Sequence, residues 1–60
     1  MKEFEVYKDN EYKLILSANG MYTLYESENG KWYGSATGPH SYILMVLRDH
    51  KLDRIISAIT

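Results

Sequence analysis

The side chains that could perform chemistry are few and scattered in this sequence. Its two histidines, His40 and His50, stand ten residues apart. On a helix this spacing separates them by about 15 Å along the axis, so they cannot share a metal ion. The chain contains no cysteine, which excludes disulfides and cysteine-held zinc. We therefore expect no metal site and no other cofactor.

Nucleophilic and acid–base chemistry also lack a recognisable arrangement. Ser41 follows His40 directly, and no nucleophile-elbow pattern surrounds it. Glu26 and Glu28 would lie on one face of a strand, but general acid–base catalysis needs burial to separate the pKa values of two carboxyl groups. These glutamates are better interpreted as solvated charges. We expect a protein that is not an enzyme and that has no evident small-molecule substrate.

Length and composition indicate one small globular domain over residues 1–60. Hydrophobic residues make up 45% of the chain and charged residues 25%, as is typical of folded proteins. A domain of this size buries only about 60% of its unfolded surface, so oligomerisation would help it. The longest apolar run, residues 42–47, is too short to span a membrane, and no signal-peptide core is present. We expect a cytoplasmic protein.

Two Asn-Gly pairs indicate β-hairpins. Asn19-Gly20 and Asn29-Gly30 each stand between segments rich in strand-forming residues, and this dipeptide favours a two-residue turn. They predict strands near residues 12–18, 21–28 and 31–37, with a fourth over residues 3–8. The predicted fold is α+β, with a small antiparallel β-meander of three to four strands packed against one C-terminal α-helix.

Two-residue turns fix the strand register and therefore the two faces of the sheet. In this register Leu14 pairs with Tyr25, and both fall on the core face together with Trp32 and Ala36. The opposite face points to solvent. It is predicted to bind a partner protein through these residues: Tyr22, Leu24, Glu26, Glu28, Lys31 and Tyr33.

A helix is predicted after the meander. Gly38 and Pro39 end the strands, and the chain from Pro39 or Ser41 to Ile59 contains no helix breaker. At 100° per residue, one side of this helix would cover the sheet with these apolar residues: Leu44, Met45, Leu52, Ile55, Ile56 and Ile59. An alternative makes residues 42–47 a fifth strand, and periodicity does not exclude it.

Three apolar residues lie outside that helical stripe, namely Ile43, Val46 and Leu47. On one long helix they fall on the side away from the sheet. We expect them to form a homodimer interface, where burial at about 25 cal/mol per Å² adds stability that one small core lacks. The roles of this surface and of the outer sheet face could be reversed.

The predicted function is that of a non-enzymatic protein-interaction module, a homodimer that covers a surface of a larger, unidentified protein. Inhibitors and regulators encoded by phages or as accessory proteins act in this way. The alternative is a nucleic-acid-binding module in which Tyr22 and Tyr33 stack on bases. The net charge of −1 and the neighbouring Glu26 and Glu28 make nucleic acid the less favoured partner.

Overall fold

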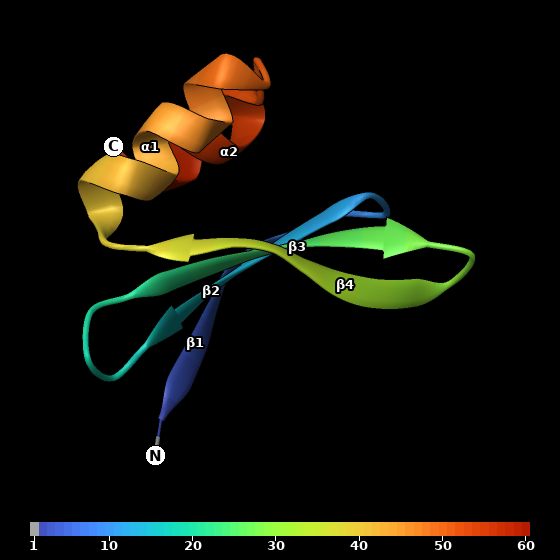
Figure 1. Cartoon of the computed structure of the whole chain (residues 1–60), viewed down its shortest axis with the longest axis horizontal. Coiled ribbons are helices and arrows are strands. Elements are labelled where there is room, and N and C mark those ends of the chain that lie inside the picture. The colour runs from blue at the N-terminus through green and yellow to red at the C-terminus, as the bar shows by residue number, and fades with distance from the viewer. Residues whose placement is uncertain (1) are drawn as a thin grey trace.

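The computed structural model describes residues 2–60 and shows a four-stranded antiparallel meander followed by two helices (Figure 1). The elements follow one another as β1 (Glu3–Lys8), β2 (Tyr12–Ser17), β3 (Tyr22–Glu28), β4 (Lys31–Gly38), α1 (His40–Asp49) and α2 (Asp53–Ile59). The strand order is β1-β2-β3-β4. The predicted α+β meander is confirmed, but the single predicted helix is two helices. The run at 42–47 is helical, so the fifth-strand alternative is wrong.

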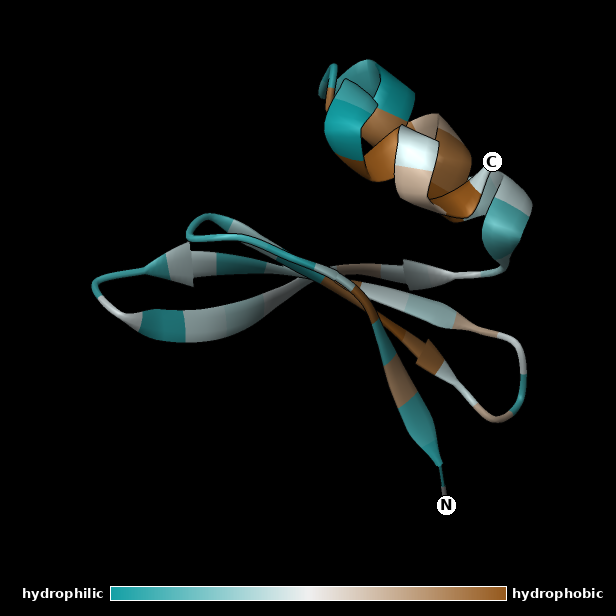
Figure 2. Cartoon of the chain, turned by 180° about the vertical axis from the view of Figure 1, so that it is seen from behind, coloured by the Kyte–Doolittle hydropathy of each residue, from teal (hydrophilic) through white to brown (hydrophobic). Residues whose placement is uncertain are grey.

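Both helices lie on one side of a strongly twisted sheet (Figure 1). α1 packs on β3 and β4, and α2 packs on β1. The most hydrophobic stretches lie in the helices and along β2 (Figure 2). The buried core consists of six aliphatic residues: Leu14, Leu24, Ile43, Leu47, Leu52 and Ile55. Among the described residues, no helix is long and apolar enough to cross a membrane.

The sheet therefore has two unlike faces, which follow from its register. The covered face, under the helices, carries Leu14, Leu24 and Ala36, which pair with one another across three strands. The open face carries the alternate positions, among them Lys13, Ile15, Thr23, Tyr25, Trp32 and Thr37. None of these six belongs to the core cluster or to the partly buried apolar residues packed on it.

The β3–β4 hairpin has the predicted turn. Asn29 and Gly30 have φ values of 53° and 78°, as a two-residue turn with two left-handed positions requires. Glu28 lies opposite Lys31, as predicted. Here a local signal suffices, because the turn alone determines how the two strands pair.

The β2–β3 turn is one residue longer than predicted. The N–H of Ser17 donates to the carbonyl of Met21 at 2.9 Å, and the N–H of Gly20 donates to the carbonyl of Ser17 at 3.0 Å. Gly20 has a φ of 85°. These bonds define a three-residue loop with glycine in the left-handed position, which is the second common way to close a hairpin.

This extra residue reverses the predicted faces of β3, because a slip of one residue turns every side chain to the other side. Leu14 pairs with Leu24 rather than with Tyr25, and Leu24 is buried. Tyr25 and Trp32, predicted in the core, lie on the open face. A register shift beside Leu24 then returns Ala36 to the covered face, where it was predicted.

The helices are separated by a Schellman motif around Lys51, which has a φ of 57°. The N–H of Leu52 donates to the carbonyl of Leu47 at 2.9 Å, and the N–H of Lys51 donates to the carbonyl of Arg48 at 3.1 Å. Leu47 and Leu52 are both in the core and supply the apolar contact that accompanies this motif. A lysine occupies the position usually held by glycine, so the sequence contains no visible helix breaker.

The break decides which helical residues face the sheet. On one continuous helix, Ile43 and Leu52, nine residues apart, would lie on opposite sides, whereas the turn brings both into one core. Ile43 and Leu47 are fully buried and Val46 is half-buried against them, while Met45, predicted inward, is 51% exposed. The predicted outward placement of Ile43, Val46 and Leu47 is therefore wrong. Their burial within one chain removes the reason for expecting a dimer through them.

Asp9 ties the β1–β2 loop to α2. Its carboxylate accepts hydrogen bonds from the Tyr7 hydroxyl at 2.7 Å and from the N–H groups of Glu11 and Tyr12 at 2.7 and 2.8 Å. Arg54 of α2 lies 3.3 Å from Asp9 and 3.0 Å from Glu11. The hydrogen bond from Tyr7, followed by the backbone bonds and the Arg54 charge, holds the pKa of Asp9 below its usual 3.8. The same hydrogen bond raises the pKa of Tyr7.

Lys51→Gly should raise the free energy of unfolding by about 0.5–1 kcal/mol, because glycine adopts a positive φ without the steric cost that other residues bear. Lys51→Val should lower it, since a β-branched residue is least tolerant of that conformation. Urea denaturation followed by circular dichroism measures both changes. Equal stability of the three proteins would contradict the Schellman motif at this position.

Asp9→Asn tests the loop contact through pH. The pKa of Asp9 is lower in the folded chain than in the unfolded one. The charged form of Asp9 therefore stabilises the fold at pH values above the ordinary pKa of 3.8. That contribution is lost as the pH falls through the folded pKa. The variant should therefore be less stable than the wild type near neutral pH, and the gap should close below about pH 4. Denaturation at a series of pH values measures the gap, and a gap independent of pH would contradict the role of the Asp9 charge.

Candidate functional site

The six residues predicted to bind a partner do not form one exposed surface: Tyr22, Leu24, Glu26, Glu28, Lys31 and Tyr33. The β3 members share a face, as predicted, but it is the covered face. Leu24 is only 1% exposed. Tyr22 is half-buried against the core, with its ring centre 5.8 Å from that of His40. The predicted outward position of Leu24 and Tyr22 is wrong, because the β2–β3 turn contains one more residue than the prediction assumed.

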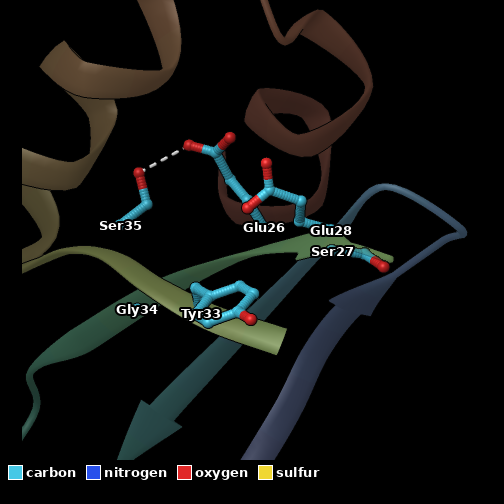
Figure 3. Close-up of a pocket in the computed structure, with 6 residues that line it drawn as sticks. All are labelled: Glu26, Ser27, Glu28, Tyr33, Gly34 and Ser35. Carbon is cyan, nitrogen blue, oxygen red and sulfur yellow. Dashed lines mark hydrogen bonds between the residues drawn. The ribbon is translucent and has the colours of Figure 1, made fainter. Parts of the chain in front are cut away.

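Glu26, Glu28 and Tyr33 line a shallow hollow of about 330 Å³ at the β3–β4 hairpin (Figure 3). The hydroxyl of Ser35 donates to the Glu26 carboxylate at 2.7 Å. Both glutamates are exposed. The hollow therefore offers carboxylate and hydroxyl groups for polar contacts at the surface of the hairpin.

The two histidines lie apart from one another in the roles that the structure gives them. In the part of the chain that the structure describes, no three His, Asp or Glu side chains converge on a position that could hold an ion. His40 instead joins the two helices, because its Nε2 lies 2.9 Å from the carbonyl oxygen of Ile59. The role of His40 that is visible here is thus to fix the end of α2 against the start of α1.

The open face holds the most distinctive side-chain cluster of the molecule. Lys13 of β2, Tyr25 of β3 and Trp32 of β4 come from three adjacent strands. The Lys13 Nζ lies 5.1 Å from the centre of the Tyr25 ring and 4.8 Å from the centre of the Trp32 ring, within the range of cation–π attraction. All three side chains are half-buried. We call these three residues the Lys13 cluster.

The pairing of the strands explains how this cluster forms. Lys13 and Tyr25 lie directly opposite each other, and Tyr25 lies opposite Gly34 on the next strand. A Cβ atom on Gly34 would be 4.0 Å from the Tyr25 ring, so the ring lies over the glycine. The long apolar stem of lysine can cover aromatic surface while its ammonium group stays near water. The cluster thus combines a flat aromatic surface with a cationic group.

Sequence reasoning missed this cluster because it placed Tyr25 and Trp32 in the core. A signal that could have revealed it is the pairing of aliphatic residues. Leu24 is the only aliphatic residue of β3, and a core built on Leu14 needs it directly opposite. Only the register with the three-residue β2–β3 turn brings these two leucines together.

Comparison with known proteins does not add a family, since no family model, curated protein or solved structure matches this chain.

Lys13→Met should keep an apolar stem over the two rings but remove the ammonium group. We expect the free energy of unfolding to fall by about 0.5–1 kcal/mol, the usual size of a partly exposed cation–π contact. The emission of Trp32, the only tryptophan, should also change as the charge leaves its ring. Lys31→Met, at an exposed lysine of the hairpin, is the matched control and should alter neither. Unchanged Trp32 emission in Lys13→Met would show that the ammonium group does not rest on this ring.

Proposed function

We propose that this chain is a non-enzymatic protein-interaction module that docks on another protein through the open face of its sheet. The observation that carries the proposal is the asymmetry of the sheet. The helices cover one face only, and the other face presents the single tryptophan of the chain clustered with Tyr25 and Lys13.

The chemistry of the open face suits a protein surface. Tryptophan and tyrosine are enriched among the residues that dominate binding energy at protein interfaces. Around them lie Ile15 and two threonines, Thr23 and Thr37, whose hydroxyl groups are 3.0 Å apart in a hydrogen bond between strands. An apolar centre with polar neighbours is the usual composition of such an interface.

Covering a surface is the mode of action that this shape favours. Small molecules bind mostly in concave sites that enclose them, whereas the Lys13 cluster is spread over three neighbouring strands of a sheet. A module that lays such a face on a larger protein blocks whatever that protein does there. The proposed role is therefore that of an inhibitor or regulator.

Nucleic acid is supported less well than protein. Of the two tyrosines predicted to stack on bases, Tyr22 is half-buried against the core, and the exposed Tyr33 lies beside the carboxylates of Glu26 and Glu28. On the open face, the Lys13 ammonium already lies beside both rings, where a stacked base would need access. The net charge of −1 adds no general attraction for a polyanion.

Trp32→Ala should weaken binding to the partner by about tenfold or more, because an aromatic anchor at an interface commonly contributes 2 kcal/mol or more. The measurement is affinity capture from the native host with tagged wild type and tagged variant, followed by titration of any captured protein. Since Trp32 lies outside the core, the variant should keep its circular dichroism spectrum.

Met45→Ala is the matched control, because Met45 is apolar and 51% exposed on a helix, away from the open face. It should bind the same protein with unchanged affinity. If the two variants retain every captured protein equally, the open face is not the docking surface. A single-stranded oligonucleotide titrated against Trp32 emission at two salt concentrations tests the alternative, since such binding weakens as salt rises.

A further inference from the structure

The open face carries opposite charges at its two ends. Glu3 and Glu5 of β1 lie on this face, opposite Ser17 and Ile15 of β2. The register shift between Glu5 and Tyr7 keeps Lys8 on the same face, where it pairs with Lys13. β1 therefore begins with the negative Glu3 and Glu5 and ends with the positive Lys8, which lies opposite the positive Lys13 of β2.

This arrangement of charges is complementary to the same arrangement on a second copy of the chain. If two copies are placed face to face about a two-fold axis that crosses β1 between Glu5 and Lys8, the strands of the second copy run in the reverse direction. The acidic end of each face then meets the basic end of the other. A contact between identical chains related by a two-fold axis must use a patch that complements itself, and these four charges satisfy that condition.

We infer that the open face binds a second copy of this chain in such a two-fold pair. The inference rests on the proposed role of that face as a docking surface, and it names a second copy as the occupant when the larger protein is not bound. The self-complementary charges select this occupant, because an unrelated acidic or basic surface would attract one end of the face and repel the other. Like charges brought together at an interface disfavour a partner strongly.

The packing of two sheets would also bury side chains that stay partly exposed in a single chain. Ile15, Tyr25 and Trp32 are apolar or aromatic, yet they remain half-buried in a single chain. Stacked sheets lie about 10 Å apart with interdigitated side chains, which would remove these three residues from water. The charges of β1 lie at the sheet edge, so they would set the orientation of the pair more than its affinity.

This pair uses a different surface from the dimer that the sequence suggested. Ile43, Val46 and Leu47 are taken up by the core of each chain or packed on it. The two copies would meet on the side of the sheet away from the helices, so both helical layers would lie outermost. The order of layers would be helices, sheet, sheet, helices.

Two charge-reversed variants test the inference. The first, Lys8→Glu with Lys13→Glu, makes all four charges of the face negative. The second, Glu3→Lys with Glu5→Lys, makes all four positive. Sedimentation equilibrium at several protein concentrations should show dimers for the wild type. It should show self-association weakened by roughly tenfold or more for each variant alone, and a restored one-to-one pair when the two variants are mixed.

The double variant Lys31→Glu with Lys51→Glu is the control for net charge, because Lys31 lies opposite Glu28 on the other face of the sheet and Lys51 lies in the turn between the helices. It should dimerise like the wild type. Lys13 contributes to the fold, so circular dichroism should verify each variant, and Lys8→Glu alone provides a milder substitution that is expected to weaken the dimer in the same direction.

A wild-type protein that stays monomeric up to roughly 100 μM, where even a weak specific dimer would be populated, overturns the inference. So does a mixture of folded variants that forms no pair. Neither result touches the proposed function, which is judged by capture of a different protein that depends on Trp32. Conversely, a dimer that survives both charge reversals and Trp32→Ala would show that copies associate through another surface, and this also overturns the inference.

Discussion

The contact between Leu14 and Leu24 on adjacent strands is the constraint on which the rest of this structure depends. These two side chains are the contribution of the sheet to the buried core. The other four come from α1 (Ile43, Leu47), from the turn between the helices (Leu52) and from α2 (Ile55). In a chain of 60 residues the loss of any such contact removes a large share of the apolar burial that stabilises the fold. Both the register of β2 against β3 and the turn between the two helices bring the six core side chains into contact.

Two backbone turns bring that core together, and each depends on one residue with a positive φ. Gly20 closes the β2–β3 loop with one residue more than the shortest turn, which places Leu24 under the helices. Lys51 ends α1 and redirects the chain, which brings Leu52 into the same core as Leu47. Without the first turn, β3 would turn Leu24 away from the helices. Without the second, Leu52 would lie on the opposite side of one continuous helix from Ile43.

The parts of the fold that were predictable are those governed by neighbours in sequence. The Asn29-Gly30 turn, the end of the meander at Gly38 and the start of the helix after Pro39 each follow from the conformational preferences of the residues present. The β2–β3 register was not predictable in this way, because Asn-Gly is compatible with both loop lengths and a long-range contact chooses between them.

The helix break was missed for a related reason. Lys51 adopts a backbone conformation that glycine usually takes, and the position is stabilised by a contact between the buried Leu47 and Leu52. The wrong β2–β3 register also made the predicted site wrong. Tyr25 and Trp32 were assigned to the core and Leu24 to the surface, because the one-residue slip exchanges the two faces of the strand.

A sheet with a single helical layer leaves aromatic surface in water, and the Lys13 ammonium group lies over both rings of that surface. This arrangement sets a condition on any protein that covers the open face. The ammonium group would be removed from solvent together with the rings, and a buried charge without a partner is strongly unfavourable. The partner must therefore bring an acceptor to Lys13, either a carboxylate or a group of carbonyl oxygens. An uncharged apolar surface would fit the rings and still bind poorly, so the lysine that lies over the rings also makes the face selective.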